Sequence, residues 1–93
     1  MVTEPEIGRR TWLEILPPYQ LILHNDDVNS MDHVVFALTH AVTGISIERA
    51  IEIMLEAHTT GRSVVIVCPL EQAELFRERL EGYGLLSTIE SAG

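Results

Sequence analysis

The change from apolar to polar residues between positions 19 and 31 constrains the possible fold of this chain more than any other feature. The segment Tyr19–His24 is apolar and alternates enough to predict a β-strand. It ends in Asn25, Asp26 and Asp27, whose side-chain oxygens accept hydrogen bonds, and a helix start follows at once. These residue types dominate turns and helix caps, so a capped turn is the simplest interpretation. Acceptors beside an apolar wall also suit a pocket for a ligand rich in N–H groups, such as an ammonium.

The composition predicts one domain with a mainly aliphatic core. The chain has 93 residues, of which 46% are hydrophobic and 5% are aromatic. A chain of this size buries roughly 60–65% of its unfolded surface. The formal net charge of −8, from 14 acidic and 6 basic residues, repels phosphate backbones and anionic membranes. We therefore expect no nucleic acid or membrane partner, and instead a cationic protein surface or a free amine.

The cysteine content and the first residues indicate a reducing compartment. Cys68 is the single cysteine and lies in an apolar run, which predicts a buried thiol with no internal disulfide. Residues 1–6 are acidic and unlike a secretory signal. No apolar run approaches the ~20 residues that a membrane span needs. We therefore expect a cytoplasmic protein.

Residues 1–16 are predicted to form a flexible N-terminal arm, and residues 17–93 the folded domain. Proline and glycine interrupt any pattern in the arm, and Pro17 and Pro18 separate it from the first strand. Trp12 and its apolar neighbours are compatible with packing back on the domain or with a peptide that another protein grips.

Two helices are predicted after the first strand. Ser30 is a suitable N-cap for a helix over about residues 31–43, whose apolar positions follow helical spacing. Ser46 is a suitable N-cap for a second helix, and Gly61 lies where a glycine commonly ends a helix.

The last third of the chain predicts a strand, a helix and a short strand. The β-branched run Val64–Val67 predicts a central strand, and Pro69 fits the first turn of a third helix. Gly82 and Gly84 end that helix, and residues 85–90 predict the final strand. The order β-α-α-β-α-β indicates an α+β fold, with three helices packed on a small, mostly antiparallel three-stranded sheet.

His58 is the second residue of functional interest. It lies at the end of the second predicted helix, where a histidine is ordinarily a favourable charge at the negative pole of the helix dipole. The junction of this helix with the next strand would also bring His58 near the end of a neighbouring strand, where Asn25 lies. A neutral imidazole has one acceptor nitrogen, so Asn25 and His58 would each accept a hydrogen bond from one ammonium group.

Enzymatic and metal-binding interpretations have weaker support. The four histidines lack the spacings H-x-x-x-H and H-E-x-x-H, and neither a phosphate-binding glycine loop nor a Gly-x-Ser-x-Gly motif occurs. Asp26 and Asp27 are adjacent, so their side chains should diverge, which disfavours a two-carboxylate mechanism. We expect a binding module without cofactor, metal or catalytic residues. The alternative is a small enzyme or metal-binding domain that uses His58 and Asp26.

Four short elements, taken in order, resemble the ClpS family of adaptor proteins. They are Asn25-Asp26-Asp27 followed by Met31; Glu48-Arg49-Ala50; Met54-Leu55 followed by His58 and Gly61; and Gly84-Leu85-Leu86 followed by Thr88 and Glu90. The likeness covers about residues 17–91. It implies a small α+β adaptor that recognises N-degrons, meaning proteins whose exposed first residue is Leu, Phe, Tyr or Trp. Such an adaptor would deliver them to a Clp AAA+ unfoldase coupled to a peptidase.

The resemblance also implies roles for individual residues. The α-amino group of the substrate would be held by Asn25, Asp26 and His58, with Asp27 supporting the loop. The first side chain of the substrate would enter a pocket lined by Met31, Val34, Met54, Ala57 and Leu85, with Asn29 at its rim. Glu71 matches a position that contacts the N-domain of a ClpA- or ClpC-like unfoldase, to which the N-terminal arm would also be offered. The chain departs from the family pattern in three places. Asn29-Ser30 replaces a frequent Thr-Pro, His33 replaces a common aromatic residue, and Phe76 stands where some members carry a lysine for the same unfoldase contact.

Overall fold

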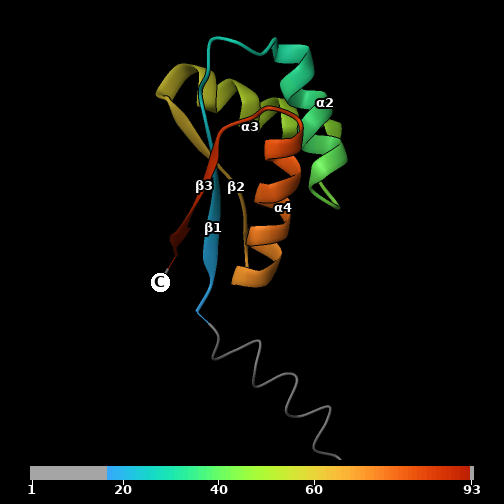
Figure 1. Cartoon of the computed structure of the whole chain (residues 1–93). Coiled ribbons are helices and arrows are strands. Elements are labelled where there is room, and N and C mark those ends of the chain that lie inside the picture. The colour runs from blue at the N-terminus through green and yellow to red at the C-terminus, as the bar shows by residue number, and fades with distance from the viewer. Residues whose placement is uncertain (1–16, 93) are drawn as a thin grey trace, which may run out of the picture.

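The computed structural model describes residues 17–92, which form three strands and three helices in the order β-α-α-β-α-β (Figure 1). The strands are β1 (Tyr19–His24), β2 (Arg62–Cys68) and β3 (Ser87–Ser91). The helices are α2 (Met31–Ala41), α3 (Ile47–Thr60) and α4 (Leu70–Gly82). The predicted α+β class and element order are confirmed. The predicted N-terminal arm, residues 1–16, lies outside the described residues.

β1 is the central strand of an antiparallel sheet with the order β2-β1-β3. Its residues Leu21, Ile22 and Leu23 are fully or almost fully buried. The prediction that Val64–Val67 forms the central strand is wrong, because β2 lies at an edge and Val67 is 54% exposed. A β-branched run indicates that a strand is covered on one face, but it does not decide which strands pair with it.

The helix ends form where local side-chain chemistry favours them. Ser30 caps α2 by accepting a hydrogen bond from the His33 N–H at 3.1 Å, and Ser46 caps α3 by accepting one from the Arg49 N–H at 3.0 Å. Gly61 ends α3 with a φ of 98°, a left-handed conformation that glycine adopts without strain. These caps fix where the loops between the elements begin.

α3 and α4 pack against the sheet on one side of the strands, and α2 packs against these two helices (Figure 1). α3 packs on β2, while α4 packs on β1 and β3. The shared core is aliphatic, as the composition indicates, and its helical members are Ala37, Leu38, Ala41, Ala50, Ile53, Ala57, Ala73, Phe76 and Leu80. Burying each large apolar side chain contributes about 1.5–3 kcal/mol to stability. Within residues 17–92, none of the helices has the length and apolar character that crossing a membrane requires.

Candidate functional site

The end of β1 is fixed between the starts of its two neighbouring strands. The Asn25 N–H donates to the carbonyl of Gly61 at 3.0 Å, and the His24 N–H donates to the carbonyl of Leu86 at 3.0 Å. Gly61 is the C-terminal cap of α3, whose last turn carries His58. The hydrogen bond from Asn25 to Gly61 therefore holds the last turn of α3 beside the end of β1.

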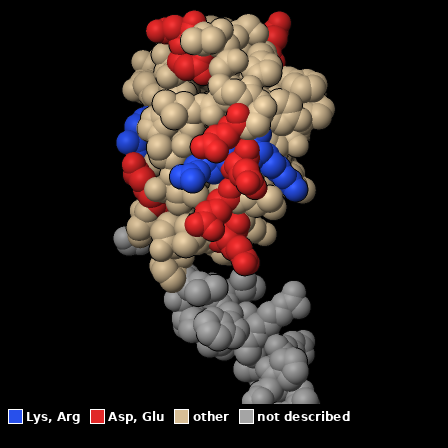
Figure 2. All heavy atoms as spheres, viewed as in Figure 1, with Lys and Arg blue, Asp and Glu red and all other residues tan. Residues whose placement is uncertain are grey.

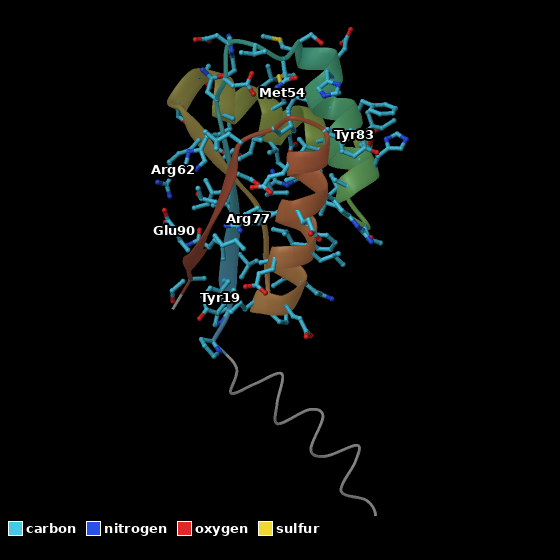
Figure 3. All side chains as sticks on the ribbon, viewed as in Figure 1. Tyr19, Met54, Arg62, Arg77, Tyr83 and Glu90 are labelled. Atoms are coloured by element: carbon cyan, nitrogen blue, oxygen red, sulfur yellow. The ribbon has the colours of Figure 1, made fainter. Side chains whose placement is uncertain are left out.

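A pocket opens at this junction, with about 340 Å³ of space that is partly open to solvent. Figure 3 shows Met54, one of its lining residues, at the end of the molecule where the loop after β1 leads into α2. The lining comes from β1, this loop, α2 and α3, and consists of Leu23, His24, Asn25, Asp26, Asn29, Met31, Val34, Met54, Ala57 and His58. Apolar side chains and hydrogen-bond acceptors thus share one small cavity.

Asp26 holds the loop between β1 and α2 in shape. Its Oδ1 accepts hydrogen bonds from the backbone N–H groups of Val28 at 2.9 Å and Asn29 at 2.7 Å, and its Oδ2 accepts one from the Asn29 side chain at 3.1 Å. Burial raises the pKa of Asp26, but these hydrogen bonds and the nearby His33 together lower it below its usual value. Asp26 therefore supplies a negative charge at the pocket at neutral pH.

The same loop is bound to the turn between α4 and β3. The Asn29 side-chain nitrogen donates to the carbonyl of Gly84 at 2.9 Å. The Nε2 of His33, at 2.7 Å, donates to the carbonyl of Tyr83, since a carbonyl oxygen can only accept. Asn29 in the loop and His33 in the first turn of α2 therefore bind the turn at Tyr83 and Gly84. These contacts fix the position of the loop at the pocket rim.

Asn25 and His58 keep their side-chain acceptors available. Both residues line the pocket and are exposed, and neither side chain makes a hydrogen bond or ion pair within residues 17–92. An amide oxygen and an imidazole nitrogen beside an ionised carboxylate suit a cation that carries several N–H donors. This wall of the pocket therefore combines hydrogen-bond acceptors with a negative charge.

Most residues predicted for the site line this pocket, but Asp27, Leu85 and Glu71 do not. Asp27 is exposed and, in the described part of the chain, its carboxylate makes no hydrogen bond, so the loop is supported by Asp26 instead. Leu85 is buried in the core, and its N–H donates to the carbonyl of Leu80 at 3.0 Å. Glu71 is exposed in the first turn of α4, away from the pocket.

Two lining residues, Leu23 and His24, were not among those predicted for the pocket. Leu23 could have been predicted from the alternation of side chains along β1, because it is the last core-facing residue before Asn25. His24 points to the other side of the strand, where its Nε2 lies 2.6 Å from the Oγ1 of Thr88. That contact joins β1 and β3 and has no counterpart in the local sequence pattern.

The metal-binding interpretation was based on His58 and Asp26, which line the same pocket. Among residues 17–92, no group of three or more His, Cys, Asp or Glu side chains is placed to hold a metal ion. Asp26 instead binds donors of its own loop.

Comparison with known proteins identifies the family. The family described as "ATP-dependent Clp protease adaptor protein ClpS" matches residues 14–88 of the chain. The chain belongs to the ClpS family. It is 46% identical over 77 residues to the ClpS adapter protein of Synechococcus elongatus, a match that covers 83% of this chain and 81% of that protein.

Other ClpS proteins are similar over most of the chain. The ClpS adapter protein of Prochlorococcus marinus is 50% identical over 74 residues, which cover 80% of this chain and 70% of that protein. The chloroplastic adapter CLPS1 of Arabidopsis thaliana is 43% identical over 90 residues, which cover 97% of this chain but only 57% of that longer protein.

A solved ClpS structure has the same fold. The structure of Agrobacterium tumefaciens ClpS2 bound to L-phenylalaninamide matches with a TM-score of 0.75 and 29% sequence identity, over 82% of this chain and 98% of that one. ClpS proteins are named as adapters of the ATP-dependent Clp protease and not as enzymes. This ClpS family member is thus a Clp protease adaptor, whose partner is the Clp machinery.

Proposed function

We propose that this adaptor recognises N-degrons with Leu, Phe, Tyr or Trp as the first residue. The observation that carries the proposal is that one pocket joins the available acceptors of Asn25 and His58 to the apolar side chains of Val34, Met54 and Ala57. A protein's first residue presents an ammonium group and a side chain on the same carbon atom. A ligand of that kind needs a polar and an apolar subsite side by side.

The ammonium group would be bound by Asn25 and His58, each through one hydrogen bond. Asp26 would favour the cation through its charge while it holds the loop, and its two oxygens already accept three hydrogen bonds from that loop. Leaving a buried acceptor or donor unpaired costs about 1–3 kcal/mol. A substrate without a free amine would cover the exposed acceptors of Asn25 and His58 without satisfying them, and would bind poorly.

The first side chain would enter between α2 and α3. Met31 and Val34 contribute from α2, while Met54 and Ala57 contribute from α3. Leu85 would support this wall from the core, and Asn29 would shape the rim. The solved structure of Agrobacterium tumefaciens ClpS2 is bound to L-phenylalaninamide, which has a free amine and a bulky apolar side chain. That complex supports a ligand of the same chemistry for this chain.

A panel of peptides that differ only in their first residue tests the proposal. We expect Leu, Phe, Tyr and Trp peptides to bind in fluorescence-anisotropy titrations, with Gly, Ser and Asp peptides at least about tenfold weaker, because burial of a large side chain contributes about 1.5–3 kcal/mol. Equal affinity across the panel would contradict the proposal.

Delivery would depend on surfaces away from the pocket. Figure 2 shows acidic side chains gathered over α4, with basic ones among them, and the outward residues there include Glu71, Glu74, Arg77 and Glu78. We propose that the N-domain of a ClpA- or ClpC-like unfoldase docks at Glu71, and that residues 1–16 are the arm offered to the unfoldase.

Two variants test delivery separately from binding. Deletion of residues 2–16, or Glu71→Arg, is expected to leave peptide affinity unchanged and to slow degradation of a Leu-starting reporter by a reconstituted unfoldase and peptidase. Degradation at the wild-type rate by both variants would contradict the docking proposal and leave the peptide panel unaffected.

A further inference from the structure

Helix α3 carries a row of apolar side chains that its own domain leaves uncovered. Ile47, Ile51 and Leu55 are 61%, 40% and 47% exposed. They are spaced four residues apart, so they lie along one side of the helix. The other side of the same helix is buried through Ala50 and Ile53. Contiguous exposed apolar surface of this kind commonly marks a binding site.

A parallel row of glutamates runs beside these apolar residues. Glu48, Glu52 and Glu56 each follow one member of the apolar row and are exposed. Arg49 pairs with Glu52 at 3.1 Å, and Glu56 accepts a hydrogen bond from the Ser63 hydroxyl at 2.6 Å. The single arginine leaves an excess of negative charge along this side of α3.

The apolar row leads directly to the pocket. Met54 lies three residues after Ile51 and His58 lies three residues after Leu55, so each pair is adjacent on the helix surface. Met54 and His58 both line the pocket. The exposed row and the pocket therefore form one continuous surface along α3.

We propose that the row formed by Ile47, Ile51 and Leu55 is a docking surface for the substrate residues that follow the first, and that it selects segments combining apolar and basic side chains. This inference depends on the proposed function of the pocket. From Ile47 to His58, α3 rises about 16 Å at ~1.5 Å per residue. An extended substrate spans that length with about five residues at ~3.3 Å each. The surface fits residues 2–6 of a bound N-degron.

Charge favours this occupant over a second copy of the chain. Pairing two copies through α3 would bring together two glutamate rows and two molecules that each carry a net charge of −8. A basic substrate segment would instead face Glu48 and Glu52 with charges of the opposite sign, while its apolar residues cover Ile51 and Leu55.

Peptides that share a first leucine test the inference with the full chain. The probes are the dipeptide amide Leu-Ala-NH2 and three hexapeptides, whose residues 2–6 are Gly/Ser only, alternating Ile and Lys, or alternating Ile and Glu. We expect the Ile/Lys hexapeptide to bind about tenfold more tightly than the Gly/Ser one, and the Ile/Glu hexapeptide to lose that gain. Lengthening the Ile/Lys peptide beyond six residues should add nothing further.

Two variants assign the gain to α3. The double variant Ile51→Ser, Leu55→Ser should remove most of the Ile/Lys gain while leaving Leu-Ala-NH2 affinity unchanged, and Glu52→Lys should reverse the preference between Lys and Glu peptides. Leu75→Ser on α4, a similarly exposed leucine, is the matched control and should keep the gain.

Three results would overturn the inference. They are a gain that persists in the double variant, a gain lost equally in Leu75→Ser, and a concentration-dependent dimer that the double variant abolishes. Failure of the pocket proposal would look different, because Leu-Ala-NH2 would then bind no better than its acetylated form.

Discussion

The side-chain amide of Asn29 donates a hydrogen bond to the carbonyl of Gly84 at 2.9 Å, which joins the loop after β1 to the turn before β3. The same nitrogen donates to the Oδ2 of Asp26 at 3.1 Å. The loop that carries Asn25 is thus held in shape by contacts within the protein. A preorganised acceptor needs less ordering when a ligand binds, which improves affinity.

Asn29→Ala should weaken both the fold and binding, because the Gly84 carbonyl and the Oδ2 of Asp26 lose the donor that the Asn29 side chain supplies. Losing about 1–2 kcal/mol from these hydrogen bonds should lower the melting temperature by roughly 4–8 °C or more, and peptide affinity about tenfold. Calorimetry and anisotropy measure the two effects. As a stability control, Asp27→Ala removes a side chain without a hydrogen bond in the described structure and should leave the melting temperature nearly unchanged. An equal loss of melting temperature in both variants would show that the bridge contributes little.

The lowered pKa of Asp26 predicts that wild type is more stable than Asp26→Ala at neutral pH and that this difference disappears in acid. Its pKa in the folded protein lies below the ordinary value of 3.8, because the hydrogen bonds of the loop favour the ionised form over the effect of burial. A lowered pKa contributes stability above the unfolded-state value, and that contribution is lost as the pH falls through the folded-state value. The melting temperature of wild type should therefore exceed that of Asp26→Ala from pH 7 to about 4, and the gap should shrink below that range. A gap that stays constant down to pH 2 would contradict this role.

Gly61→Ala should destabilise the protein through backbone conformation alone. Nothing lies within 4 Å of a Cβ built at Gly61, but its φ of 98° strains any other L-residue. We expect a loss of about 1 kcal/mol and weaker peptide binding, since Gly61 anchors Asn25. Gly82→Ala is the matched control, because Gly82 also has open space around it but is helical, and the change should be neutral or stabilising. Identical thermal shifts in the two variants would contradict the argument.

Met31 should discriminate against first residues that branch at Cβ. It begins α2 directly after the acceptor loop and lines the pocket, so it would lie beside the Cβ of a bound first residue. Val and Ile carry a second heavy atom there and rotate with difficulty about χ1. A clash of one methyl group costs about 1–3 kcal/mol, which nearly cancels the gain from burying the side chain. We expect Ile peptides to bind far more weakly than Leu peptides, and Met31→Ala to narrow that ratio. If Met31→Ala has the same Leu-to-Ile affinity ratio as wild type, Met31 does not discriminate between these residues.

Local chemistry explains why much of this structure was predictable from the sequence. Ser30, Ser46 and Gly61 determine helix ends through hydrogen bonds and φ angles that depend on a few neighbouring residues. The position of Asn25 near the α3–β2 junction was also predictable, because β1 and β2 are antiparallel neighbours and their ends meet. The helix ends need only local geometry, whereas the position of Asn25 also needs the pairing of β1 with β2.

Relationships set by the whole fold were not predictable in the same way. Both β1 and β2 are apolar, so only their pairing decides that Leu21 lies in the central strand and Val67 at an edge. Asp26 and Asp27 have the same chemistry, and only the path of the loop decides which carboxylate receives the N–H groups of that loop. The bridge from Asn29 to Gly84 joins segments 55 residues apart and leaves no local signal.

The most direct test of the account compares a Leu-starting peptide with a free N-terminus and the same peptide acetylated, titrated into the full chain at neutral pH. Acetylation removes the charge and two of the N–H donors that Asn25 and His58 would bind, and each unpaired group costs about 1–3 kcal/mol. We predict that the acetylated peptide shows no measurable binding, and that Asn25→Ala and His58→Ala each weaken the free peptide at least about tenfold. Equal affinities of the free and acetylated peptides would contradict the proposal that this pocket reads the N-terminus of a protein.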